Sequence, residues 1–236
     1  MPTAYDHFLE KYPAYKSTLS IDELRAADYS RLDRAGQVYL DYTGGGLYAD
    51  SQVRQHQQML LGGVFGNPHS SNPTSLAATK LVESARACVL RFFNADPDEY
   101  DIIFTQNASG ALKVVGEAYP FGSGDQYLLT FDNHNSVNGI REFAHARGAE
   151  VTYIPASLPD MRVDESMLEQ AWDKARPGGN NLFAYPAQSN FSSVQHPLEW
   201  IEKAHAHGWD VLLDAGIEFG LQPAGLESFH RLRGTT

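Results

Sequence analysis

An apolar run that ends on an aspartate constrains the fold of this chain more than any other stretch. Residues 211–214 (Val-Leu-Leu-Asp) close the run, and Ala-Gly-Ile-Glu-Phe-Gly follows. Such a run is typical of a strand that is buried on both faces of a parallel sheet. Asp214 then lies at the carboxyl end of that strand, at the edge where open α/β sheets bind ligands.

Three further polar clusters fall directly after a predicted strand or between a strand and a helix. They are residues 105–110 (Thr-Gln-Asn-Ala-Ser-Gly), 132–136 (Asp-Asn-His-Asn-Ser) and 188–192 (Gln-Ser-Asn-Phe-Ser). The carboxyl ends of parallel strands meet at one edge of a sheet. We therefore expect these clusters and Asp214 to line one pocket.

The fold class follows from an alternation of predicted strands and helices after residue 100. Strands are expected at 101–105, 126–131, 150–154, 181–185 and 210–214, and helices at 108–117, 136–147, 163–174 and 197–207. Repeated βα units of this length predict an α/β fold with three layers and a mostly parallel sheet.

The first part of the chain is predicted to be mainly helical. Residues 1–35 read as a helical arm, and a short strand is expected at 38–41. Asp50 is expected to cap one helix, and Thr74 or Ser75 to open a longer one. Cys88 lies on the apolar stripe of that longer helix, which predicts a place in a core.

Composition narrows the classes of partner. The 236 residues carry a formal net charge of −11 without a lysine and arginine cluster, which argues against a nucleic-acid surface. The single cysteine, Cys88, excludes an internal disulfide and a CxxC motif. No apolar run approaches the roughly 20 residues of a membrane span, and residues 1–24 lack the apolar core of a signal peptide. We expect a cytoplasmic protein that contacts neither nucleic acid nor membrane.

Residues 107–110 (Asn-Ala-Ser-Gly) lie where a helix begins, so their N–H groups and the Ser109 hydroxyl suit a phosphate. A plain helix cap formed by Ser109 is an equally good interpretation. The segment lacks both the GxGxxG pattern and the Walker lysine. If it binds a phosphate, the sequence favours a single phosphate over NAD or ATP.

The remaining clusters offer a ring, an amide and a carboxylate. His134 can act as a general base, bind a metal or stack on a planar ligand; no second ligand stands at helical spacing, so no metal site is predicted. Asn190 can hold a carboxylate or phenolate oxygen. Asp214 ends a buried strand and requires a cation opposite it.

A planar ring, one phosphate and a ring cation opposite Asp214 together describe pyridoxal 5′-phosphate. An α/β hydrolase that uses His134 and Asp214 is a weaker alternative, because the chain has no G-x-S-x-G elbow.

A known family shares these motifs in the same order. The matching segments are residues 39–45, 67–70, 103–113, 132–137, 139–142, 183–192 and 212–215. They resemble the molybdenum cofactor sulfurase branch of the class V aminotransferase and cysteine desulfurase superfamily, of fold type I. The resemblance implies a helical arm over 1–35, an incomplete cofactor-binding domain over 36–230 and an atypical tail over 231–236.

The resemblance also implies roles for individual residues. Ala108 and Ser109 would hold the cofactor phosphate, and His134 would stack on its ring. Asn190 would face the cofactor or the substrate carboxylate, and Asp214 the pyridinium nitrogen. In such enzymes cysteine supplies sulfur, which passes through an acceptor cysteine to the molybdenum cofactor, and the enzymes are usually homodimers.

The sequence departs from that family in one respect that decides activity. The Schiff-base lysine of the family lies downstream of the aspartate, and this chain ends at Thr236 before such a segment. None of its six lysines stands at a matching position, namely Lys11, Lys16, Lys80, Lys113, Lys174 and Lys203. We therefore expect no catalytic residue and an inactive, truncated sulfurase. The alternative is a non-catalytic, cofactor-binding pseudoenzyme or a regulatory partner of a full-length homologue.

Overall fold

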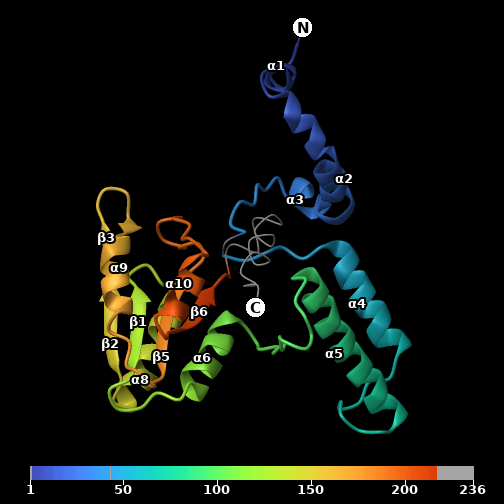
Figure 1. Cartoon of the computed structure of the whole chain (residues 1–236). Coiled ribbons are helices and arrows are strands. Elements are labelled where there is room, and N and C mark those ends of the chain that lie inside the picture. The colour runs from blue at the N-terminus through green and yellow to red at the C-terminus, as the bar shows by residue number, and fades with distance from the viewer. Residues whose placement is uncertain (1, 43, 217–236) are drawn as a thin grey trace. The chain divides into compact units, whose positions relative to one another are not determined.

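The computed structural model describes residues 2–42 and 44–216 of the chain. It divides into two compact units, Met1–Ala85 and Arg86–Thr236 (Figure 1). The predicted tail at 231–236 lies outside the described residues. The domain boundaries expected from the sequence stay a prediction.

The described part of the first unit consists of helices and connecting segments. The helices are α1 (Ala4–Lys11), the 3₁₀ helix η1 (Pro13–Thr18), α2 (Leu19–Asp28), α3 (Ser30–Arg34), α4 (Asp50–Gly62) and the beginning of α5 (Pro73–Phe92). Thr3 caps α1: its hydroxyl accepts the Asp6 N–H at 3.2 Å, and the Asp6 carboxylate accepts the Thr3 N–H at 2.6 Å. Helices thus occupy most of the segment where the sequence predicts them.

Three expectations for the sequence up to the end of α5 are wrong. Residues 38–41 form no strand; Val38 is 81% and Leu40 85% exposed, and no described segment pairs with them. A strand needs a neighbour, which a local sequence pattern does not report.

Asp50 does not cap α4; its carboxylate pairs with Arg31 at 2.7 Å, and Ala49 is the cap residue. Cys88 is exposed, because periodicity predicts a shared helix face and not what covers it.

The second unit contains the parallel sheet. Its strands are β1 (Gln126–Thr130), β2 (Glu150–Ile154), β5 (Asn181–Pro186) and β6 (Asp210–Asp214), in the order β2-β1-β5-β6. All three pairings are parallel. A small antiparallel hairpin joins β3 (Ala156–Ser157) and β4 (Arg162–Val163). The parallel sheet is the one that the alternating sequence predicts.

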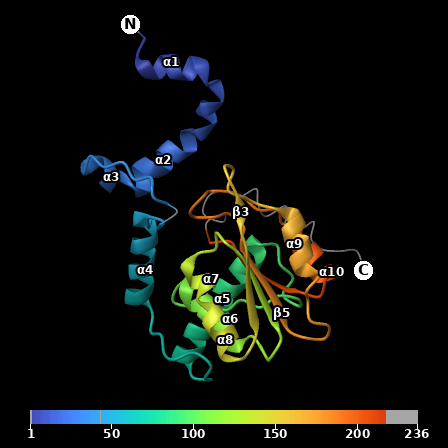
Figure 2. The ribbon, with the colours of Figure 1, turned by 90° about the vertical axis from the view of Figure 1, so that its left-hand side faces the viewer.

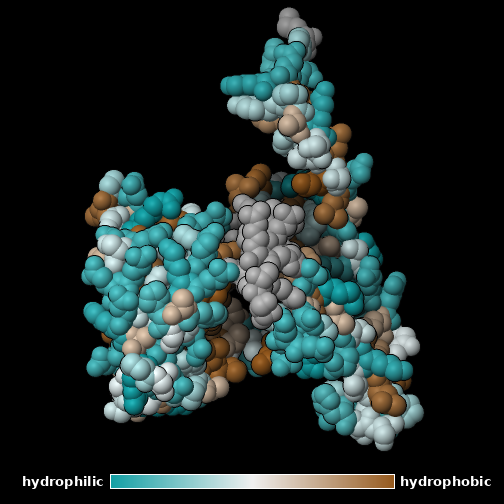
Figure 3. Space-filling view, in the orientation of Figure 1, coloured by the Kyte–Doolittle hydropathy of each residue, from teal (hydrophilic) through white to brown (hydrophobic). Residues whose placement is uncertain are grey.

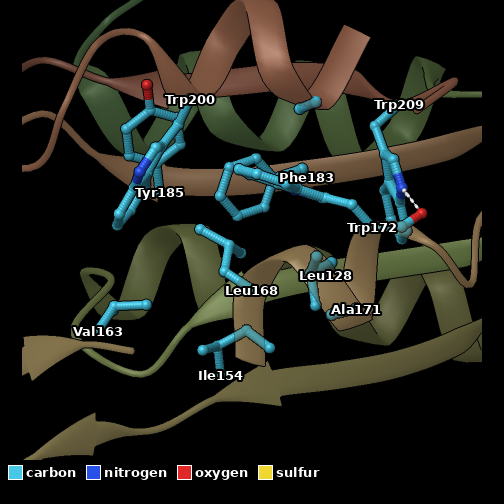
Figure 4. Close-up of a cluster of buried hydrophobic side chains, with 11 residues drawn as sticks. Leu128, Ile154, Val163, Leu168, Ala171, Trp172, Phe183, Tyr185, Trp200 and Trp209 are labelled. Atoms are coloured by element: carbon cyan, nitrogen blue, oxygen red, sulfur yellow. Dashed lines mark hydrogen bonds between the residues drawn. The ribbon is translucent and has the colours of Figure 1, made fainter. Parts of the chain in front are cut away.

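Helices cover both faces of this sheet, so the unit has three layers (Figures 1 and 2). The helices are α6 (Ala108–Ala118), α7 (Asn135–Asn138), α8 (Ile140–Ala146), α9 (Glu165–Trp172) and α10 (Trp200–Ala206). Tyr127 and Leu129 pack with α6, α7 and α8, whereas Leu128 packs with α9 and α10. Successive side chains of a strand therefore pack into two separate cores, because they point to opposite faces of the sheet. Figure 4 shows the core on the α9 and α10 side, and Figure 3 shows that the visible outer surface of this unit is mainly hydrophilic.

The strand order places a switch point between β1 and β5. From β1 the chain moves to β2 on one side, and then crosses to β5 and β6 on the other side of β1. Right-handed crossovers put the helices of the two directions on opposite faces. Ligands of open α/β sheets bind at such a switch point, at the carboxyl ends of the strands.

The strand expected at 101–105 is also absent. Ile103 is 72% and Phe104 52% exposed, and no described strand pairs with this segment. The apolar, β-branched sequence has the propensity of a strand, but propensity alone does not form a ladder.

Candidate functional site

The amino end of α6 presents two free N–H groups. Asn107 is the cap residue, and its Oδ1 accepts the Gly110 N–H at 2.8 Å. The backbone N–H groups of Ala108 and Ser109 have no acceptor among the described residues. Of the two interpretations of Ser109, the plain helix cap is wrong, because Asn107 is the cap residue. The end of α6 keeps two N–H donors and the positive end of a helix dipole for an anion.

Ser136 links Ser109 to His134. The Ser109 and Ser136 hydroxyl oxygens are 2.6 Å apart, and the Ser136 oxygen is 3.1 Å from Nδ1 of His134. The segment after β1 thereby meets the amino end of α6. Two of the predicted site residues, Ser109 and His134, are thus joined through a third residue.

The His134 ring is held at the start of α7. It serves as the helix cap, and its Nδ1 accepts the Ser136 backbone N–H at 3.2 Å. A nitrogen that accepts this N–H carries no proton, so the neutral ring has its proton on Nε2. The ring is exposed. It therefore has one anchored edge and a face available for a planar ligand.

The loop after β5 carries Asn190 on its exposed part. Ser189, next to it, is buried, and its hydroxyl donates to the backbone carbonyl of Asp132 at 3.3 Å. The same hydroxyl oxygen accepts the N–H groups of Phe191 and Ser192, both at 3.3 Å. The loop is thus tied to the segment that precedes His134.

Asp214 ends β6 beside the start of this loop. Its backbone carbonyl accepts the Ala187 N–H at 2.8 Å, and its Oδ1 accepts the Gly216 N–H at 3.1 Å. Across residues 2–42 and 44–216, no lysine, arginine or histidine forms an ion pair with its carboxylate. Asp214 is partly buried. It therefore remains available to a ligand cation.

A buried pair that the sequence did not reveal lies behind these residues. Nε2 of His196 is 2.9 Å from Oδ2 of Asp132, and the two side chains are 2% and 0% exposed. Burial raises the pKa of Asp132, but the hydrogen bond and charge of His196, together with hydrogen bonds from Thr130 and the backbone, outweigh burial, so this pKa lies below its ordinary value. Asp132 is therefore ionised at neutral pH. A histidine between Gln195 and Pro197 carries no periodic signal that points to this contact.

Asn133 is a second residue whose role the sequence did not indicate. Its buried amide nitrogen donates to the Thr130 carbonyl at 2.9 Å and to the Ala184 carbonyl at 3.0 Å. It thus clamps the ends of β1 and β5 together at the switch point.

The structure therefore brings four predicted segments to one edge of the sheet, although not every predicted side chain touches another. Ser109 and His134 are connected through Ser136, whereas Asn190 and Asp214 are placed by backbone contacts of their neighbours. Among the described residues no group of three His, Cys, Asp or Glu side chains can hold a metal ion. The edge offers N–H donors for an anion, a ring for stacking and a carboxylate for a cation.

The sequence matches a family model described as "Aminotransferase class-V" over residues 38–229. It is 35% identical to a molybdenum cofactor sulfurase of Solanum lycopersicum, covering 95% of this chain and 31% of that protein. It is 38% identical to the Bos taurus molybdenum cofactor sulfurase, covering 88% of this chain and 25% of that protein. The chain thus spans about a quarter to a third of the length of these relatives.

Solved structures show the same fold. An apo cysteine desulfurase from Thermococcus onnurineus matches with a TM-score of 0.69 at 25% identity, over 82% of this chain and 47% of that chain. A cysteine desulfurase from Escherichia coli matches with a TM-score of 0.67 at 24% identity, over 87% of this chain and 52% of that chain. The predicted fold class is confirmed.

None of the helices in the described part of the chain combines the length and apolar character that a membrane crossing requires.

Proposed function

Because the chain belongs to the aminotransferase class-V family, we propose that the carboxyl edge of β1, β5 and β6 binds pyridoxal 5′-phosphate. The observation that carries this proposal is the link from Ser109 through Ser136 to His134. It sets a helix amino end, suited to a phosphate, beside an exposed ring, suited to stacking.

The residues present fit the cofactor in three respects. The Ala108 and Ser109 N–H groups lack acceptors among the described residues, and a phosphate supplies them. His134 offers a ring face whose orientation Ser136 holds. Asp214 has no described cation beside it, and a protonated ring nitrogen would supply one.

We propose that Asp214 keeps that nitrogen protonated through a charge-assisted hydrogen bond. When bound, pyridoxal 5′-phosphate draws electrons from an amino-acid substrate. Asn190 stands on the loop beside the site, where its amide can orient a cofactor oxygen or a substrate carboxylate. The donor set therefore supports binding and orientation of both molecules.

We propose cysteine as the amino-acid substrate and sulfur transfer as the reaction of the lineage, because the similar proteins are molybdenum cofactor sulfurases and cysteine desulfurases. We propose that the sulfur acceptor is a protein cysteine or a molybdenum cofactor. The same proposal includes a homodimeric assembly and a cytoplasmic location.

The lysines support a non-catalytic role for these 236 residues by themselves. In the second unit, Lys113 pairs with Glu117 on α6 at 3.2 Å, and Lys203 of α10 lies 3.4 Å from Glu165 of α9. These two ammonium groups form ion pairs on the helix surface, and Lys174, the third lysine of the unit, is exposed after α9. We propose that the chain holds the cofactor without a covalent link, so that it binds and does not by itself transfer sulfur.

Equilibrium dialysis with pyridoxal 5′-phosphate tests the binding proposal. Ser109→Asp puts a carboxylate where the phosphate is expected and should weaken binding at least about tenfold by charge repulsion. Ser123→Asp is the matched control, because Ser123 lies in the turn before the amino end of β1 and the proposed site lies at the carboxyl end. This variant should bind the cofactor like the wild type. Equal affinity of Ser109→Asp and the wild type would refute this site.

Borohydride reduction followed by peptide mass spectrometry tests the non-covalent part. We expect no lysine to be labelled stoichiometrically. Stoichiometric labelling of one of the six lysines, prevented by Ser109→Asp, would show a covalent link and overturn the non-catalytic proposal.

A further inference from the structure

The buried Asp132–His196 pair takes no part in the binding roles proposed above. Its two side chains are almost completely shielded from solvent, and the pair joins positions 64 residues apart in the sequence. One member lies two residues before His134, and the other closes the loop that carries Asn190. The pair therefore spans the two segments that flank the proposed cofactor ring.

The loop 187–196 is closed by its own hydrogen bonds and ends at His196. The His196 N–H donates to the Ala187 carbonyl at 2.9 Å, and the Ser189 N–H donates to the Val194 carbonyl at 2.9 Å. Gln188 and Gln195 form an antiparallel bridge between these contacts. Asn190 thus lies in the part of the loop that the hydrogen bond between Ser189 and Val194 closes, and His196 is held to the first residue of the same loop.

Aromatic side chains fix the His196 ring from the core side. It stacks on Trp200 with ring centroids 5.0 Å apart and an interplanar angle of 30°. The Tyr185 ring is nearly perpendicular to it, with ring centroids 6.3 Å apart and an interplanar angle of 78°. Trp200 and Tyr185 belong to the core on the α9 and α10 side of the sheet (Figure 4). The ring is thus packed against the buried core of the unit.

His196 orients the Asp132 carboxylate together with the Thr130 hydroxyl and the Asp132 backbone. The Oδ1 of Asp132 is buried and has no hydrogen-bond partner among the described residues. Its backbone carbonyl accepts the Ser189 hydroxyl, which is a second link between the same two segments. Separating a buried, ionised carboxylate from its partner is costly, because it leaves an uncompensated buried charge.

We propose that Asp132 and His196 are positioning residues, which fix the loop carrying Asn190 against the segment carrying His134 and thereby set the affinity for the cofactor. The effect on affinity rests on the proposed function, whereas the coupling of the two segments does not. A pair that only stabilised the fold would lower the stability of the whole unit without a selective effect on these segments.

Hydrogen exchange and cofactor binding are measured on the full chain for four variants. His196→Leu removes the hydrogen bond, and His196→Gln keeps an N–H donor for Asp132. Asp132→Asn retains the shape but removes the charge, and it carries the test if His196→Leu does not fold. Leu168→Ala, in the core on the α9 and α10 side and outside both segments, is the control for general destabilisation.

We expect His196→Leu and Asp132→Asn to raise the exchange rates of amides in 187–196 and 131–138 at least about tenfold more than Leu168→Ala does, and to weaken binding of pyridoxal 5′-phosphate roughly tenfold. His196→Gln should restore most of both properties. Leu168→Ala should bind like the wild type while it remains folded.

Two results would overturn the inference. One is uniform exchange changes that match those of Leu168→Ala. The other is selective exchange changes with unaltered affinity, which would leave a coupling without a role in binding. If the wild type itself does not bind pyridoxal 5′-phosphate, the proposed function fails, and the exchange rates alone then decide whether the pair couples the segments.

Discussion

Ser109 and Ser136 stand 27 residues apart in the sequence, and their hydroxyl oxygens lie 2.6 Å apart. Ser109 belongs to the first turn of α6, and Ser136 to α7 beside the end of β1. This contact joins the helix end suited to a phosphate to the ring of His134. It is therefore the relationship on which the geometry of the proposed site depends.

Ser136→Ala should weaken binding of pyridoxal 5′-phosphate about fivefold, because a hydrogen bond contributes about 1 kcal/mol. Ser136→Thr keeps a hydroxyl and should retain most of the affinity. Equilibrium dialysis of both variants measures the difference. Unchanged binding by Ser136→Ala would show that the link does not support the site.

Asp214→Asn should weaken binding of the cofactor about tenfold, because a neutral amide replaces a charge-assisted hydrogen bond worth about 1.5 kcal/mol more. Asp160→Asn is the matched control, since Asp160 is exposed between β3 and β4. Titration of each variant with pyridoxal 5′-phosphate gives the affinities. Equal losses in the two variants would mean that net charge, and not the position of Asp214, controls binding.

Leu168→Ala should lower the free energy of unfolding by about 3 kcal/mol, because Leu168 is fully buried between α9 and the sheet. Its neighbour Met167 is 43% exposed, and Met167→Ala should cost less than about 0.5 kcal/mol. Urea unfolding measures both. A cost below 1 kcal/mol for Leu168→Ala would contradict the packing described here.

Asp125 should make the stability depend on pH in the acid range. Burial raises the pKa of Asp125, but hydrogen bonds from Asn180, from the Gly122 N–H and from Arg176 outweigh it, so this pKa lies below its ordinary value of 3.8. The folded chain therefore binds fewer protons than the unfolded chain between the two pKa values. The resulting stability is complete above the ordinary pKa and is lost as the pH falls through the folded pKa.

Urea unfolding of the wild type and Asp125→Asn at pH 6 and pH 3 tests this dependence. At pH 6 the variant should be less stable by about 2 kcal/mol, since a hydrogen-bonded charge is lost. At pH 3 the difference should be smaller. An identical difference at both pH values would show that Asp125 does not titrate in this range.

The parallel sheet was predictable from the sequence because its signals are local and repeated. The apolar run that ends at Asp214 is a short local signal, and the helices between successive strands show helical periodicity. The segments 38–41 and 101–105 have a similar composition, yet neither forms a strand. Whether such a segment joins a ladder depends on a partner elsewhere in the chain, which a local pattern does not contain.

The candidate site was predictable by position but not by contact. The clusters after β1, after β5 and at the end of β6 lie at one edge, as expected from parallel strands. The caps were not predictable, because Asn107 and Ser109 are both good cap residues two positions apart. The pair of Asp132 with His196 joins distant segments, so only the folded chain reveals it.

The crystal structure of the chain with bound pyridoxal 5′-phosphate tests the central claim most directly. We predict the phosphate within hydrogen-bond distance of the Ala108 and Ser109 N–H groups, the ring against His134 and its nitrogen at the Asp214 carboxylate. Density for the cofactor at another place on the chain, or none at a saturating concentration, would contradict the account.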